Sequence, residues 1–256
     1  MNNRLLCIDI GNTNITFGVY EEDVLTSTWR METQSVSSFT TVHDNIIYNN
    51  GDVCHGVMIG SVVPKVTEIL QGLHTAMPEA NILFCNDKDI KWGLEILSGD
   101  MREVGEDILL NGISGYDKYK KALLIIDFGT ATTFDVFNDD GNFVGTVIAP
   151  GVNLSLKALY EAAAQLPIVS VEPTQKIVGT NTKDCMQSGI FWGYISMIEG
   201  LVAKIQKELE VELQVIATGG LAPLFEQQTP VIKIVEQSLT LDGLRILSKR
   251  NFLLNE

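Results

Sequence analysis

The sequence contains two similar segments that lie about half a chain apart. "LLCIDIGNTNITFGVY" occupies Leu5–Tyr20, and "LLIIDFGTATTFDVF" occupies Leu123–Phe137. Three pairs of residues align when one residue is dropped from the first segment: Asp9 with Asp127, Gly11 with Gly129, and Phe17 with Phe134. Each segment reads as a strand, a tight polar turn and a second strand. A chain that repeats such a unit is expected to fold as two similar α/β halves.

The pattern of apolar residues around the two segments supports this duplication. In the first half we expect strands at 5–10, 15–20, 24–30, 56–64 and 81–84, and helices at 37–48, 65–77 and 106–119. In the second half we expect strands at 122–127, 132–137, 143–148 and 213–217, and helices at 151–165, 182–209, 221–225 and 240–249. No Pro-rich or Ser-rich linker separates the halves, so residues 1–118 and 119–256 are expected to pack with a cleft between them.

Composition excludes some classes of partner. The 256 residues carry a net charge of -14, which argues against DNA or RNA as the main partner. Backbone amides can still hold a small anion. No apolar run approaches the roughly 20 residues that cross a bilayer, and the N-terminus does not read as a signal peptide. The four scattered cysteines read as buried free thiols of a cytoplasmic protein.

The two aspartate turns are suited to holding phosphate. Glycine lets the backbone approach an oxyanion closely, and successive amides in a tight turn form an anion-binding nest. Thr13, Asn14 and Thr130 add further donors. An aspartate at a strand end can hold Mg²⁺ through water. Two such turns facing one cleft would hold a polyphosphate from both sides, and the late "VIATGG" (Val215–Gly220) would let backbone lie flat against a base or ribose.

The long predicted helix at 182–209 is interrupted by Gly189, Gly193 and Gly200. Each glycine costs a helix about 1 kcal/mol, so three of them indicate that another backbone comes close. We therefore expect a homodimer in which this helix packs near its symmetry mate, through Gly189 and Gly193.

These motifs resemble a known family. "DIGNTN", "DFGTATT", "APG", "AAQLP", "VGTNT", "QSGIFWGY" and "ATGGLA" are similar to motifs of the type III pantothenate kinases, which belong to the acetate and sugar kinase, Hsc70 and actin superfamily. The resemblance covers nearly the whole chain. It implies two ribonuclease-H-like (actin-like ATPase) domains with mixed sheets, a homodimer, and ATP-dependent phosphorylation of pantothenate at the start of coenzyme A synthesis. It also implies ATP with Mg²⁺ and a monovalent cation, K⁺ or NH₄⁺.

The resemblance also assigns roles to particular residues. It places the ATP site on Asp9, Ile10, Gly11, Asn12, Thr13, Asn14, Ile15, Thr16, Thr130, Gly219 and Gly220. It places the monovalent cation on Asp127, with Thr130, Thr132 and Thr133 offering neutral oxygens nearby, and the catalytic base on Asp107. It places the pantothenate site on Gly105, Glu106, Asp107, Ile108 and Thr182.

The acceptor half departs from the family pattern. The family motif Gly-Ala-Asp-Arg reads Gly105-Glu106-Asp107-Ile108 here, and Ser98 stands where the family usually has a tyrosine. Losing a cation and gaining a carboxylate near a site for a carboxylated acceptor is unfavourable. Two alternatives therefore stay open: a weakly active or non-catalytic nucleotide-binding relative with a regulatory role, and a kinase of a different small hydroxy acid.

Overall fold

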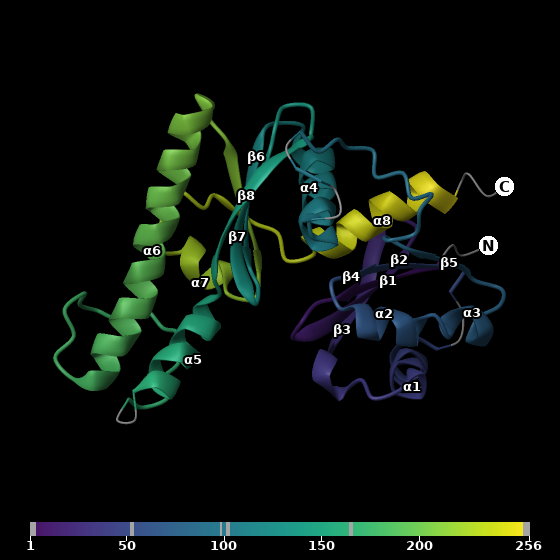
Figure 1. Cartoon of the computed structure of the whole chain (residues 1–256), viewed down its shortest axis with the longest axis horizontal. Coiled ribbons are helices and arrows are strands. Elements are labelled where there is room, and N and C mark those ends of the chain that lie inside the picture. The colour runs from purple at the N-terminus through teal and green to yellow at the C-terminus, as the bar shows by residue number, and fades with distance from the viewer. Residues whose placement is uncertain (1–3, 52–53, 98, 101–102, 164–165, 253–256) are drawn as a thin grey trace. The chain divides into compact units, whose positions relative to one another are not determined.

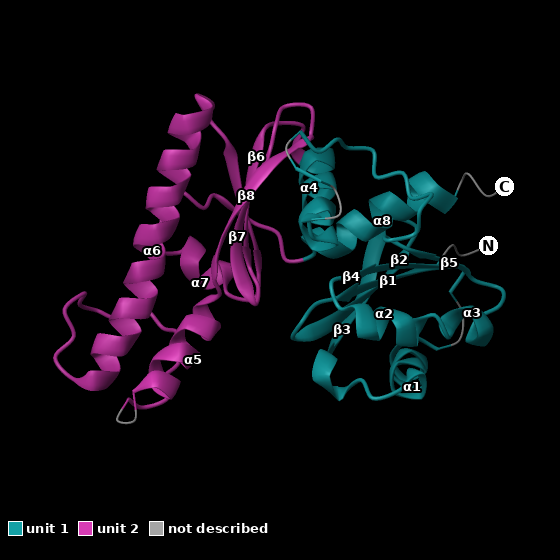
Figure 2. Ribbon diagram, in the orientation of Figure 1, with its two compact units in different colours: residues 1–118, 238–256 teal, residues 119–237 magenta. Residues whose placement is uncertain are grey.

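The computed structural model describes residues 4–51, 54–97, 99–100, 103–163 and 166–252 (Figure 1). The chain divides into two compact units (Figure 2). Unit 1 comprises Met1–Lys118 with Ser238–Glu256, and unit 2 comprises Tyr119–Gln237. The expected halves differ from these units only at the end, because the last helix belongs to the first unit.

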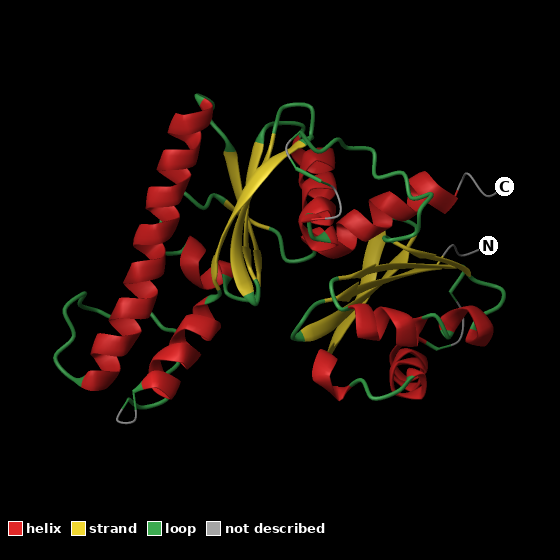
Figure 3. Cartoon of the chain, viewed as in Figure 1, coloured by secondary structure: helices red, strands yellow, loops and turns green. Residues whose placement is uncertain are grey.

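Unit 1 contains a five-stranded mixed sheet in the order β3-β2-β1-β4-β5. Figure 3 draws the strands in yellow and the helices in red. The strands of unit 1 are β1 (Arg4–Ile10), β2 (Asn14–Glu21), β3 (Val24–Glu32), β4 (Gly56–Ser61) and β5 (Asn81–Phe84). Its helices are the 3₁₀ turn η1 (Thr33–Ser35), α1 (Phe39–Asn50), α2 (Pro64–Leu70), α3 (Leu73–Ala76), α4 (Glu106–Tyr119) and α8 (Leu239–Phe252). The side chains of α1, α2 and α3 share one apolar core with strands β1, β2, β4 and β5. Helix α8 packs on β1, β2 and β4, on the opposite face of the sheet from α1 and α2 (Figure 1).

Unit 2 contains a second sheet in the order β10-β9-β6-β7-β8. Its strands are β6 (Leu123–Phe128), β7 (Ala131–Phe137), β8 (Phe143–Pro150), β9 (Gln214–Gly219) and β10 (Ile234–Val235). Its helices are α5 (Val152–Ala162), α6 (Thr182–Leu209) and α7 (Ala222–Glu226), and they share an apolar core with β6, β7 and β9. Asn181 begins α6, because its side chain accepts a hydrogen bond from the Asp184 amide at 3.0 Å.

Strand register confirms the duplication seen in the sequence. Asp9 pairs with Thr16 across β1 and β2, and Asp127 pairs with Thr133 across β6 and β7. The first turn holds one residue more than the second, as the alignment required. Each sheet also continues from its aspartate strand into a parallel neighbour, β4 in unit 1 and β9 in unit 2. The two mixed sheets therefore have the same topology.

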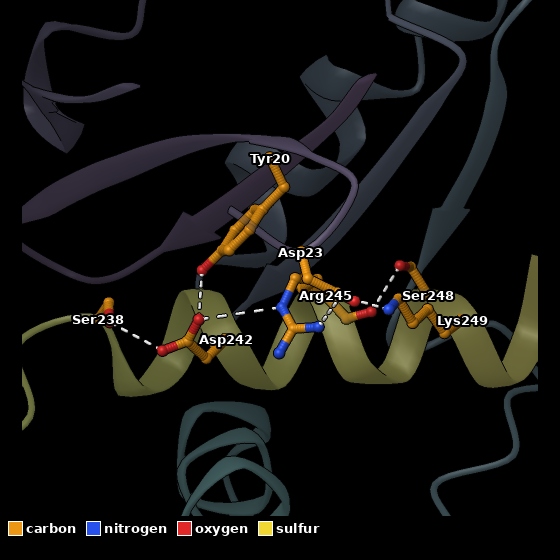
Figure 4. A network of polar contacts seen from close by, with 7 residues as sticks. All are labelled: Tyr20, Asp23, Ser238, Asp242, Arg245, Ser248 and Lys249. Carbon is orange, nitrogen blue, oxygen red and sulfur yellow. Dashed lines mark hydrogen bonds and ion pairs between the residues drawn. The ribbon is translucent and has the colours of Figure 1, made fainter. Parts of the chain in front are cut away.

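Helix α8 is fastened to the sheet of unit 1 by a buried polar network (Figure 4). The Tyr20 hydroxyl on β2 donates to Asp242 Oδ1 at 2.7 Å, and the Ser238 hydroxyl donates to Asp242 Oδ2 at 2.8 Å. The Arg245 guanidinium lies 5.6 Å from the centroid of the Tyr20 ring. Burial and the bond to Asp242 raise the pKa of Tyr20, so its hydroxyl stays a donor.

The same helix is held a second time at the β2–β3 turn. Arg245 and Lys249 both donate to Asp23, which lies in that turn. The bond from Lys249 is the largest cause that lowers the pKa of Asp23. At the C-terminal end of α8, the Asn251 side chain accepts from the Lys91 amide at 2.8 Å. These contacts explain why the last helix belongs to unit 1 although it follows unit 2 in the chain.

Some details differ from the sequence-based expectations. The helix expected at 65–77 is two short helices, α2 and α3, because the chain turns at Gln71 and Gly72. The two-residue strand β10 was missed, since nothing in so short a stretch has a period. Cys185 is exposed, whereas Cys7, Cys54 and Cys85 are buried free thiols as expected. Among the described residues, no helix is long and apolar enough to span a membrane.

Candidate functional site

The first aspartate turn is closed by its own backbone. The Gly11 amide donates to the Asn14 carbonyl oxygen at 3.0 Å. A side chain at Gly11 would place its Cβ 3.1 Å from the same oxygen, so the tight turn favours glycine. Asn12, Thr13 and Asn14 are exposed at the tip. The tip of the turn is therefore open to solvent, and its role in phosphate binding stays a prediction.

A residue that sequence analysis missed holds this turn in place. The Thr33 hydroxyl donates to the Gly11 carbonyl oxygen at 2.7 Å, and the Thr33 amide donates to the Thr13 carbonyl oxygen at 2.9 Å. Thr33 is buried at the end of β3, in the 3₁₀ turn η1. Two bonds from one residue fix the turn from outside. Nothing in the local sequence marks this threonine, because its role depends on the pairing of β2 with β3.

The second aspartate turn is packed against two glycines of unit 2. Gly219, at the end of β9, has a φ of 88°. A Cβ there would lie 2.7 Å from the Phe128 carbonyl oxygen and 2.9 Å from Asp127 Oδ1. A Cβ at Gly151, in the "APG" motif, would overlap the Thr130 carbonyl oxygen. The structure thus brings together the second turn, the "APG" motif and the first glycine of "ATGG".

Helix α6 fixes this arrangement from behind. The Tyr194 hydroxyl donates to the Pro150 carbonyl oxygen at 2.7 Å and lies 2.7 Å from the Ser155 hydroxyl. Pro150 directly precedes Gly151, so Tyr194 of the "QSGIFWGY" motif positions the loop that abuts Thr130. This explains why motifs about 60 residues apart belong to one site.

The expected cation ligands Thr132 and Thr133 lie on opposite faces of the second sheet. Thr133 pairs with Asp127 across the strands, so their side chains share a face. Thr132 pairs with Phe128 and lies on the other face, where its buried hydroxyl has no hydrogen-bond partner among the described residues. The expectation that Thr132 offers an oxygen beside Asp127 is therefore wrong, because successive strand residues point to opposite faces.

The Asp127 face also carries a carboxylate that sequence analysis missed. Asp135 is fully buried and accepts hydrogen bonds from Thr133 Oγ1 at 2.8 Å and Thr146 Oγ1 at 2.5 Å. Strand alternation predicts that Asp135, two residues after Thr133 in β7, lies on the same face as Thr133. Its burial could not be predicted from the sequence, because burial depends on the packing around the sheet.

The first turn of α4 carries the expected base. Asp107 Oδ1 accepts from the Ile108 amide at 2.9 Å. Burial raises the pKa of Asp107, and this bond opposes part of the rise. A side chain at Gly105 would collide with the Asp107 carboxylate, so glycine there lets the aspartate fold back over the helix start. A carboxylate with a raised pKa in a polar first turn is suited to general-base chemistry.

Glu106 does not project away from the protein. Its Oε2 accepts from the Ser61 amide at 2.8 Å, at the end of β4. Burial raises the pKa of Glu106 to about 7; the Ser61 amide opposes this rise, while Asp107 and Asp87 add to it. Ile108 is buried at 9% exposure and contributes to the core of unit 1 rather than to a charged surface. The two departures from the family motif are thus packed into the fold.

The other predicted substrate residues are distributed as follows. Thr182 is exposed at the first position of α6 in unit 2, where free helix amides add donors. A Cβ at Gly179, in the preceding "VGTNT" loop, would lie 2.5 Å from the Cys185 amide nitrogen, so this loop lies tightly against the helix start. Ser98 and part of the "AAQLP" segment lie outside the described residues. Gly220 is exposed next to Gly219.

Comparison with known proteins points to one family. The family model of type III pantothenate kinases matches residues 5–204. A type III pantothenate kinase of Paramagnetospirillum magneticum is 43% identical over 96% of this chain and 97% of its own length.

Two solved structures share the fold at low identity. The 2-hydroxyisocaproyl-CoA dehydratase activator of Clostridium difficile has a TM-score of 0.56 at 10% identity and covers 98% of this chain and 97% of its own. The inorganic polyphosphate/ATP-glucomannokinase of Arthrobacter sp. strain KM has a TM-score of 0.51 at 15% identity and covers 98% of this chain and 100% of its own. With motifs, topology and sequence in agreement, this chain belongs to the type III pantothenate kinase family.

Proposed function

We propose that this chain transfers the γ-phosphoryl group of ATP to the primary hydroxyl of pantothenate, the first step of coenzyme A synthesis. The match to kinases of that name along nearly the whole chain carries this proposal. The exposed tip of the first turn supports it, as does the carboxylate at the start of α4.

In this mechanism Asp107 accepts the proton of the acceptor hydroxyl as that oxygen attacks phosphorus. Its raised pKa brings its basicity closer to neutral pH, where a general base is most effective. The turn at 11–14 and the turn at 129–130 would bind the phosphates through their amides. Catalysis would rest mainly on positioning and on charge stabilisation.

The metals can be tested against the donors present. Mg²⁺ is bound by one or two carboxylates together with phosphate oxygens and water, so Asp9 at the end of β1 suits it. For a monovalent cation, Asp127 Oδ1 is a carboxylate oxygen close to the backbone of Gly219, since a Cβ there would come 2.9 Å from it. Thr133 shares that face. We propose that K⁺ or NH₄⁺ binds beside Asp127 and offsets phosphate charge.

We further propose that the chain acts as a homodimer through the exposed side of α6. A Cβ at Gly189, Gly193 or Gly200 would meet nothing within 4 Å outside its own helix, so no other described segment of the chain fills the space beside these glycines. On the neighbouring elements of unit 2, Ile148 and Leu154 are exposed apolar side chains at 66% and 51%. A second copy would cover such a surface.

A different acceptor is the second candidate, and Ile108 favours it. A buried isoleucine cannot pair with the carboxylate of pantothenate, as an arginine at that position could. Another small hydroxy acid, without that carboxylate or with it placed elsewhere, would not need the arginine.

ADP release separates these functions. It would be measured with pantothenate and with a panel of related hydroxy acids, in the presence of Mg²⁺ and K⁺. ADP release that depends on pantothenate supports the first function, and release with another acceptor only supports the second. ATP binding without turnover of any acceptor would contradict both and favour a nucleotide-binding role.

A further inference from the structure

Glu106 occupies a position that links three parts of unit 1. It is the first residue of α4, directly before Asp107. Its carboxylate accepts the Ser61 amide across 45 residues of sequence. Ser61 is the last residue of β4 and pairs with Ile10 of β1, which directly precedes the first phosphate turn. The start of α4 is therefore connected to the strand end that carries this turn.

The Ser61 side of this link is itself held in place. The Thr67 hydroxyl of α2 donates to Ser61 Oγ at 2.7 Å, and the Val63 amide donates to the same oxygen at 3.1 Å. The Val62 amide donates to the Ile10 carbonyl oxygen at 3.0 Å. These hydrogen bonds hold the end of β4, the turn after it and α2 together. The Glu106 carboxylate connects α4 to this group through the Ser61 amide.

We propose that Glu106 is a positioning residue: by binding the Ser61 amide it fixes the start of α4, and with it Asp107, relative to the strand end that carries the first phosphate turn. This inference rests on the proposed kinase function. It also gives Glu106 a role other than contact with the acceptor, since its carboxylate is engaged by the strand end. A misplacement of a catalytic group by about 1 Å can cost about 100-fold in rate. Loss of the hydrogen bond between Glu106 and Ser61 can therefore have a large effect on kcat.

The surroundings of Glu106 make the link sensitive to protons. Glu106 interacts electrostatically with Asp107 on α4 and with Asp87 and Cys85, which follow β5. Burial, with Asp107 and Asp87, raises the pKa of Glu106 to about 7. Below that pH the neutral carboxyl group is the weaker acceptor for Ser61, and above it the ionised group binds the amide with charge assistance.

Two substitutions at Glu106 and one matched control test the proposal. Glu106→Ala removes the link, Glu106→Gln keeps an acceptor oxygen without the proton, and Glu103→Ala removes an exposed carboxylate three residues earlier. We expect Glu106→Ala to lower kcat by about 10-fold to 100-fold with little change in KM for ATP. Glu106→Gln should keep kcat at pH 8 within about fivefold of the parent, and Glu103→Ala should match the parent.

The pH profile provides a readout that simple loss of structure would not move. In the parent, kcat should fall below about pH 7 as Glu106 gains a proton. Glu106→Gln removes this titration. Its acid limb should therefore move to lower pH. An acid limb identical to that of the parent would overturn the proposal.

Amide exchange tests the link without activity. Hydrogen exchange of the Ser61 amide, followed by NMR, should be faster in Glu106→Ala than in the parent and in Glu103→Ala. Unchanged exchange would overturn the link, and faster exchange with unchanged kcat would overturn its role in positioning. If the parent releases no ADP with pantothenate, the proposed function is contradicted. The exchange measurement still tests the hydrogen bond between Ser61 and Glu106 in that case.

Discussion

The contact between Gly219 and the second aspartate turn predicts the effect of one added methyl group. In Gly219→Ala the new Cβ would lie 2.7 Å from the Phe128 carbonyl oxygen and 2.9 Å from Asp127 Oδ1, where ordinary contacts begin at 3.4 Å. The backbone must then move by 0.7 Å, the difference between 3.4 Å and 2.7 Å. The moving segment is the end of β6 that leads into the turn.

Two costs and one gain set the magnitude. A residue with a Cβ at a φ of 88° costs about 1–2 kcal/mol, and crowding in a packed site costs about 1–3 kcal/mol. Replacing glycine also restricts the unfolded chain, which returns about 0.4–1 kcal/mol. The net loss is about 3 kcal/mol for unit 2, or a fall in Tm of about 6–12 °C.

Gly220→Ala is the matched control. Gly220 is the next residue, its φ is not positive, and a Cβ there meets nothing within 4 Å. It should change stability by less than about 1 kcal/mol. Thermal unfolding followed by circular dichroism, with and without ATP, measures both variants. Gly219→Ala should also show a smaller stabilisation by ATP, because the displaced turn binds phosphate less well. Equal Tm values for the two variants would refute the packing argument.

The remaining predictions concern the base, the cation and the dimer. Asp107→Asn should lower kcat by about 100-fold or more and leave ATP binding, measured by calorimetry, nearly intact; turnover equal to the parent would remove Asp107 from the mechanism. Activity should rise when Na⁺ is replaced by K⁺ or NH₄⁺, and identical rates in the three salts would contradict a cation beside Asp127. Light scattering should give twice the 28.2 kDa chain mass, and Gly193→Leu should shift it toward one chain. A single-chain mass for the parent at micromolar concentration would contradict the dimer.

Ile108 offers a direct test of the acceptor. If pantothenate is the acceptor, Ile108→Arg should supply a charge-assisted contact worth roughly 1.5–3 kcal/mol, which corresponds to a gain of at least about tenfold in kcat/KM for pantothenate. The coupled assay for ADP measures it. No gain in a folded variant, with an efficient parent enzyme, would mean that another group holds the carboxylate.

The sequence alone determined the duplicated plan of the protein. Two copies of a strand–Asp–x–Gly–turn–strand segment predicted the two sheets and the residue-by-residue alignment, down to the one extra residue in the first turn. This was possible because alternation and glycine turns are local signals, which depend on near neighbours in the chain. The same local reading predicted the two phosphate turns, and the resemblance to the family motif predicted Asp107 as the base.

Only the tertiary structure decided which distant residues support those turns. Thr33 holds the first turn, Tyr194 holds the "APG" loop, and the Glu106 carboxylate reaches Ser61. Sequence analysis had interpreted Glu106 as a repulsive charge near the acceptor, because nothing local shows where a long side chain ends. Strand facing likewise excluded Thr132 from the Asp127 site. Such contacts join segments 20 to 45 or more residues apart in the chain, and they form only when strands and helices have packed.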